Sequence, residues 1–118
     1  SWMNKIEHNG YGHYHYHTNS IYSAIFYFDS YDSGELVFYN PFPTTFELNC
    51  DDDVEDTVFN SHEWEIKPQK NRLVIFPSQL HHQVLKNTSG KNRYSLAFNL
   101  FPSGKFGEVD SALNITHV

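Results

Sequence analysis

The sequence predicts an all-β domain, a sandwich or barrel, and three observations lead to that class. About seven short segments are rich in aromatic and β-branched residues, and turn residues such as Gly, Pro, Asn and Asp bound them. Aromatic residues make up 17% of the 118 residues, a content that favours strands. No stretch has a sustained helical period. Short strands with frequent turns are typical of sandwiches and barrels.

The individual strands follow from hydrophobic patterning and from the turn residues between them. The segments predicted as strands are 13–17, 21–28, 35–42, 62–68 and 72–77, with a turn at 29–34. Residues 81–86 and 93–101 are predicted to form a hairpin around the polar turn 87–92. The tail from Pro102 is polar and weakly patterned. We therefore expect a domain over residues 1–101 and a C-terminal extension over residues 102–118.

The composition limits the partners. The formal net charge is −6, and the eight Lys and Arg residues are not clustered as phosphate contacts require. Nucleic acid and anionic membrane surfaces are therefore not expected partners. No apolar run approaches the roughly 20 residues that span a bilayer. We also expect no signal peptide, since the first residues lack its apolar stretch. The expected substrate is a small molecule or a peptide, and the sequence is compatible with a homo-oligomer.

Cysteine usage points to a compartment. The single cysteine, Cys50, cannot form an internal disulfide, which favours a reducing, cytoplasmic environment. Cys50 lies within the acidic segment 49–57, whose carboxylates would raise the pKa of its thiol. We expect a free thiol without a catalytic role in a solvated loop.

The stretch GHYHYHTNS places three histidines on alternate positions. In an extended strand His13, His15 and His17 line one face. The outer two lie roughly 13 Å apart at Cα, too far to share one ion comfortably, whereas two same-face neighbours lie roughly 6.6 Å apart. One H-x-H pair is therefore suited to a metal, and on a wet face the same pair binds nothing in particular.

A second histidine cluster follows a buried strand and a proline turn. FPSQLHHQV contains His81 and His82, and only one of these neighbours can face inward. Metal sites in β-folds commonly combine a close pair on one strand with a distant third ligand. One H-x-H pair with His81 or His82 is thus the candidate metal site.

Five motifs in order resemble a family, the small 2-oxoglutarate- and iron(II)-dependent oxygenases common in marine bacteria and phage. The motifs are HYHTNS (15–20), SAIFYF (23–28), GELVFYNPF (34–42), VIFPSQLHHQV (74–84) and RYSLAFN (93–99). With Trp2, the resemblance covers nearly the whole chain. It implies a double-stranded β-helix, a jelly-roll barrel of two sheets with the metal at its mouth. Helices often brace one sheet of such a core, so an N-terminal portion before SWMN is expected.

The resemblance also implies residue roles. The family's first histidine ligand falls on His15, the next ligand position on His17 and the distal histidine on His82. The arginine that grips the far carboxylate of 2-oxoglutarate falls on Arg93, in an R-x-S arrangement with Ser95. His13 and His81 then become flanking residues.

The implied activity is that of a dioxygenase with two cofactors, Fe(II) and 2-oxoglutarate. Three protein ligands leave three of six positions on the metal, two of them for 2-oxoglutarate. Decarboxylation to succinate and CO2 would accompany hydroxylation of a substrate that the sequence does not identify. The broader superfamily uses a 2-His-1-carboxylate triad, whereas His17 stands at the carboxylate position here.

Two other readings remain open at the level of sequence. A cupin is a related barrel that binds a metal through H-x-H and a distal histidine. The chain lacks the glutamate expected shortly after H-x-H, and Arg93 has no task in a cupin. A non-enzymatic jelly-roll structural or binding protein would leave the histidines facing solvent. Binding of 2-oxoglutarate distinguishes the oxygenase from both.

Overall fold

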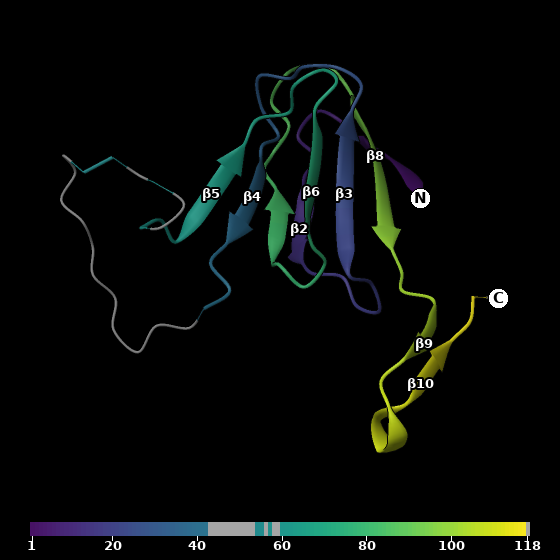
Figure 1. The fold of residues 1–118 in the computed structure, drawn as a ribbon. Helices are drawn as coiled ribbons and strands as arrows, with labels where there is room; N and C mark the ends of the chain where they lie inside the picture. The colour runs from purple at the N-terminus through teal and green to yellow at the C-terminus, as the bar shows by residue number, and fades with distance from the viewer. Residues whose placement is uncertain (43–53, 56, 58–59, 118) are drawn as a thin grey trace.

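Two four-stranded antiparallel sheets form the body of the protein (Figure 1). The computed structural model describes residues 1–42, 54–55, 57 and 60–117. The strands of these two sheets are β1 (Trp2–Ile6), β2 (Gly12–His15), β3 (Tyr22–Tyr27), β4 (Leu36–Tyr39), β5 (Glu63–Ile66), β6 (Leu73–Pro77), β7 (His82–Val84) and β8 (Arg93–Leu100). The strand orders are β1-β8-β3-β6 and β2-β7-β4-β5. This architecture confirms the predicted all-β jelly-roll class.

The core lies between the two sheets. Its buried members come from β3, β4, β6 and β8 and comprise Ile25, Tyr27, Leu36, Phe38, Phe76 and Ala97. In β3 and β4 these core residues occupy alternate positions on one sheet face, while Ala24 and Val37 on the other face are also buried. Phe38 and Phe76 meet edge to face across the layers, with ring centroids 4.8 Å apart. Apolar burial thus fixes which face of each strand points inward.

The C-terminal residues form a small unit of their own. Strands β9 (Gly104–Phe106) and β10 (Leu113–Ile115) make a two-stranded sheet around the short 3-10 helix η1 (Val109–Ser111). This hairpin extends from the end of β8, away from the two main sheets (Figure 1). The sequence indicated only a polar tail here. Short hairpins with few buried side chains lack the hydrophobic alternation by which strands are recognised.

The predicted strands inside residues 21–101 agree with β3 to β8 to within a few residues at each end. The prediction that segment 72–77 is buried is wrong, because β6 is an edge strand and its Leu73 and Ile75 are exposed. Strand β1 was not predicted, because WMNKI mixes polar and apolar residues over only five positions. Cys50 and most of the acidic segment 49–57 lie outside the described residues. Within the residues that the structure describes, no helix is long and apolar enough to cross a membrane.

The predicted hairpin between residues 81–86 and 93–101 is wrong. Strand β7 lies between β2 and β4 in one sheet, and β8 lies between β1 and β3 in the other. Both edges of each strand are therefore already paired, so the polar segment 87–92 connects two sheets. The sequence shows the turn, but it does not show which partners the flanking strands take.

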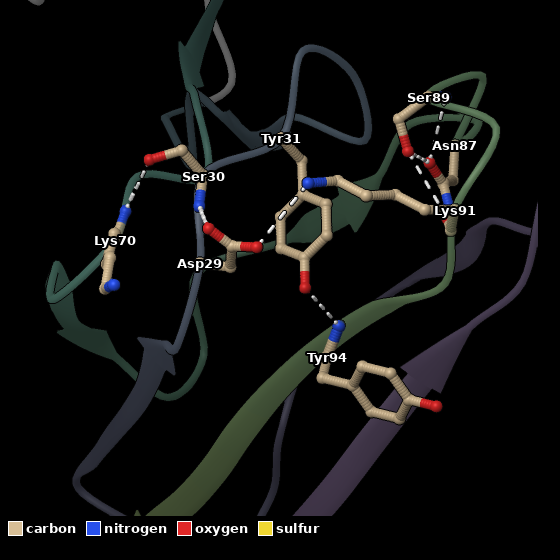
Figure 2. Close-up of polar contacts among 8 residues, drawn as sticks. All are labelled: Asp29, Ser30, Tyr31, Lys70, Asn87, Ser89, Lys91 and Tyr94. Carbon is tan, nitrogen blue, oxygen red and sulfur yellow. Dashed lines mark hydrogen bonds and ion pairs between the residues drawn. The ribbon is translucent and has the colours of Figure 1, made fainter.

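Asn87 holds this crossing connection in place. It is fully buried, and its side-chain amide donates to the carbonyl oxygens of Ile6 at 3.0 Å and Lys91 at 2.8 Å. Its Oδ1 accepts from the Ser89 hydroxyl at 2.6 Å (Figure 2). Figure 2 also shows the Tyr31 hydroxyl accepting the backbone N–H of Tyr94 at 3.0 Å. These bonds satisfy the polar groups of the connection and fix where β8 begins.

Candidate metal centre

Three histidines, two from one H-x-H motif and one from a distant strand, converge at one end of the space between the sheets. Their candidate ligand atoms, one from each of His15, His17 and His82, all lie within 4.8 Å of one another. Ring centroids are 4.3 Å apart for His15 and His82, and 5.2 Å apart for His17 and His82. His82 is 2% exposed, His17 is half-buried and His15 is exposed. The cluster therefore has a buried base and an open side.

Strand pairing and one backbone hydrogen bond create this convergence. His15 ends β2 directly opposite His82 at the start of β7, so the two rings share one sheet face. His17 lies two residues beyond β2, and its backbone N–H donates to the carbonyl of Ser78 at 2.8 Å. Because His17 lies beyond the end of β2, the spacing of side chains along a straight strand does not fix its position.

Two backbone carbonyls orient the imidazoles. The Nδ1 of His15 lies 2.6 Å from the carbonyl oxygen of His13, and the Nδ1 of His82 lies 2.8 Å from that of Leu80. Since a carbonyl only accepts, each Nδ1 carries the proton and donates it. The Nε2 of each ring is then left with its lone pair, which is the tautomer that a metal ligand needs.

Burial keeps His82 neutral. It lowers the pKa of His82 to about 4, the bond to Leu80 opposes the shift, and the neighbouring His15, His17 and His81 add to it. Burial and then His15 also lower the pKa of His17. Only the neutral imidazole binds a metal, so these two rings are suited to coordination at neutral pH. The residues present therefore fit a divalent metal whose preferred ligands are nitrogen atoms.

The other two histidines of the motifs lie elsewhere. His81 faces away from the interior, with its ring 5.2 Å from that of Tyr14 and 4.8 Å from that of Tyr16. His13 packs against Tyr11, with ring centroids 5.0 Å apart. Neither belongs to the metal-ligating group found among the described residues.

A cavity of about 300 Å³ connects the histidine cluster to Arg93. Arg93 begins β8 and is 1% exposed, and Ser95 on the same strand face is equally buried. Both line the cavity together with the three clustered histidines. Within the described part of the chain, no carboxylate forms an ion pair with Arg93. The cavity thus has a cluster of imidazoles at one end and a buried cation at the other.

Arg93 is held by aromatic and backbone features. Its Nη2 donates to the hydroxyl of Tyr27 at 3.1 Å, and its guanidinium carbon lies 5.0 Å from the centroid of the Tyr27 ring. Gly34 makes room for it, since a Cβ at this position would lie 3.1 Å from the Arg93 Cδ. The Nε of Arg93 is buried without a hydrogen-bond partner. A buried guanidinium with an unused donor is costly unless an anion completes it.

Sequence reasoning did not single out several residues of this cavity. Tyr27 resembles an ordinary core aromatic, and its contact with Arg93 depends on a pairing of β3 with β8 that is distant in sequence. Asn4, Ser23 and Asn99 also line the cavity. All three are polar residues at inward-facing positions of strands. They can be recognised as such only once the inward face of each strand is known.

The comparisons with known proteins agree with this geometry. The family model described as "Putative 2OG-Fe(II) oxygenase" matches residues 1–99, and no curated protein matches the chain. The family implies Fe(II) and 2-oxoglutarate as cofactors, and the cluster of His15, His17 and His82 fits iron binding. The match covers most of the 118 residues. The chain therefore belongs to this family of 2-oxoglutarate- and iron(II)-dependent oxygenases.

Proposed function

We propose that the protein is a dioxygenase that hydroxylates a small molecule or a peptide while 2-oxoglutarate is decarboxylated to succinate and CO2. The single observation that carries this proposal is the buried Arg93, which shares one cavity with the three-histidine cluster and has no carboxylate partner among the described residues. A buried, permanently charged fork facing a metal site is suited to the far end of a dicarboxylate.

His15, His17 and His82 would hold the iron, and Arg93 with Ser95 would bind the far carboxylate. When bound, iron(II) and 2-oxoglutarate supply the oxidising chemistry, and the protein's own residues bind, orient and exclude water. Ser95 lies two residues from Arg93 on the same strand face, so its hydroxyl is available as a second donor. Tyr27 restrains the guanidinium from the neighbouring strand. These residues and the family match lie within residues 1–101, where we locate the catalytic unit.

The donor set has one consequence for the charge of the site. With His17 in place of a carboxylate, the ligands carry no negative charge, and the metal keeps its full formal charge. Among the described residues that line the cavity none is a carboxylate, so the bound cosubstrate would supply the negative charge that balances the metal and Arg93. This favours binding of a dianion whose two carboxylates neutralise both ends of the cavity.

The two competing readings account for fewer of these features. A structural jelly roll gives no reason to bury His82 with its Nε2 free. A cupin site would use the histidines but would leave Arg93 buried without purpose. The need for iron(II) and the single cysteine both favour a reducing cytoplasm as the place of action.

Anaerobic titration tests the proposal. Protein loaded with one equivalent of Fe(II) should develop a visible charge-transfer band when 2-oxoglutarate is added, and the band should saturate at one equivalent. Metal binding without any response to 2-oxoglutarate would favour the cupin reading. Absence of stoichiometric metal binding would favour the structural jelly roll.

A further inference from the structure

Asn99 lies on the same face of β8 as Arg93, at the other end of the strand. Side chains alternate along a strand, so Arg93, Ser95, Ala97 and Asn99 all point toward the cavity. Six positions separate Arg93 from Asn99, roughly 20 Å at 3.3 Å per residue. The two polar side chains therefore serve different regions of one cavity wall.

Strand pairing aligns Asn99 with the histidine cluster. Ser23 of β3 lies opposite Asn99 on one side and opposite Phe76 of β6 on the other. The Phe76 ring packs against His82, with ring centroids 4.8 Å apart. Asn99 thus belongs to the row of the sheet that reaches the metal ligands, whereas Arg93 begins the strand at the far end.

A chain of hydroxyl groups fixes the orientation of the Asn99 amide. The Oγ atoms of Ser20 and Ser78 are 2.8 Å apart, those of Ser78 and Ser23 are 2.9 Å apart, and Ser23 Oγ lies 2.7 Å from Asn99 Oδ1. Each hydroxyl has one proton, and an amide oxygen only accepts. Ser23 must therefore donate to Asn99, Ser78 to Ser23, and Ser20 to Ser78. Every proton in the chain is directed toward Asn99.

The amide nitrogen of Asn99 is consequently the group left for the cavity. Its oxygen is committed to Ser23, and among the described residues no acceptor bonds to its Nδ2. The same Ser78 that belongs to the chain accepts the backbone N–H of His17. One buried serine thus positions both a candidate metal ligand and a pair of amide donors beside it.

We propose that Asn99 binds the metal-side end of the cosubstrate, donating from Nδ2 to an oxygen of its 1-carboxylate or keto group. This inference rests on the proposed function. It divides recognition of one dianion between two residues of a single strand, Arg93 for the far carboxylate and Asn99 for the near end. A neutral donor suits the near end, because a second cation there would repel the metal.

Oxalate and 2-oxoglutarate distinguish binding at the metal-side end of the cosubstrate site from binding at its far end. Oxalate carries the metal-binding end but has no far carboxylate, whereas 2-oxoglutarate has both. We would measure their affinities by calorimetry under nitrogen for Co(II)-loaded protein, comparing the parent with Asn99→Ala, Asn99→Asp and Arg93→Ala. Metal stoichiometry and the unfolding midpoint of each variant establish that the fold is intact.

Asn99→Ala should weaken both ligands by about 10- to 100-fold, the usual effect of losing a hydrogen bond to a charged group. Asn99→Asp should weaken both further, because a carboxylate repels the anion. Arg93→Ala should weaken 2-oxoglutarate alone. Asn4→Ala is the matched control, since Asn4 lines the same cavity opposite Ser95, and it should leave oxalate binding unchanged.

The outcomes distinguish the two proposals. If Asn99→Ala and Asn99→Asp bind oxalate as tightly as the parent while Arg93→Ala loses 2-oxoglutarate, the assignment of Asn99 is wrong and the proposed function stands. If the parent itself does not bind 2-oxoglutarate, the proposed function fails. Ser23→Ala should show a smaller loss for both ligands, because the amide then turns freely.

Discussion

The two ends of the cavity are built from different kinds of structure. The arginine end uses β8 and β3, the two interior strands of their sheet, and Arg93, Ser95 and Tyr27 are almost wholly buried. The histidine end uses the edge strand β2, the loop after it and the neighbouring interior strand β7, and its rings range from exposed His15 to buried His82. A closed end suits a ligand of fixed length and charge. An open end suits a site that admits a second, larger molecule.

This difference suggests that the two ends respond differently to mutation. Removing a group from the closed end leaves a buried partner unsatisfied, whereas the open end can recruit water. Four measurements test the contrast, beginning with the largest expected effect.

His82→Ala should abolish stoichiometric metal binding, because His82 is the one buried ligand of the cluster. His81→Ala should leave binding nearly intact, since that ring packs on Tyr14 and Tyr16 outside the cluster. Metal content after dialysis of each variant gives the answer. Equal losses in the two neighbouring variants would contradict the assignment.

Arg93→Ala should lower 2-oxoglutarate affinity by about 30- to 1,000-fold, or about 2–4 kcal/mol, while metal affinity barely changes. Arg93→Lys keeps the charge but loses the planar fork, so its affinity should be intermediate. Anaerobic titration of the charge-transfer band measures both. A parent-like affinity in the alanine variant would exclude the dicarboxylate assignment.

The stability of the metal-free protein should fall as the pH drops from about 6.5 to about 4. Burial lowers the pKa of His82 from 6.5 to about 4, so over this range the unfolded chain binds more protons than the folded one. The contribution of neutral His82 to the free energy of unfolding is fully present above pH 6.5, and about 3 kcal/mol of it is lost by pH 4. Urea unfolding of chelator-treated protein between pH 4 and pH 7 measures it. His82→Gln should flatten the profile, and an unchanged slope in that variant would assign the effect elsewhere.

Tyr27→Phe should destabilise the protein by about 2 kcal/mol, because the Nη2 of Arg93 loses its acceptor inside the closed end. The change in unfolding midpoint should be smaller with saturating Mn(II) and 2-oxoglutarate, whose carboxylate offers a replacement acceptor. Tyr14→Phe is the control, since the Tyr14 side chain is exposed on the face of β2 that points away from the cavity. Equal destabilisation by both substitutions would refute the contrast between the ends.

The sequence predicts the local features of this molecule well and the long-range ones poorly. Runs of aromatic and β-branched residues bounded by turns identify β3, β4, β6 and β8, and the alternation of side chains requires that His81 and His82 point in opposite directions. It does not predict that β7 and β8 belong to different sheets, because a turn sequence is compatible with either a hairpin or a crossing. The contact of Tyr27 with Arg93 and the orientation of Asn99 depend on that same pairing. The sequence alone could therefore predict neither the contact of Tyr27 with Arg93 nor the orientation of the Asn99 amide.

Strand β1 pairs with β8, the last strand of the same sheet, and this pairing affects how the protein folds. Trp2 of β1 lies opposite Ala97 of β8, so almost the whole chain must be available before β1 finds its partner. Non-local pairings of this kind slow folding, since the entropy of closing a long loop is lost before any contact forms. The cavity is lined by residues from β1, β2, β3, β6, β7 and β8. Until β8 has formed and paired, the cavity therefore lacks the wall that carries Arg93, although the strands and loop that hold the three histidines precede β8 in the chain.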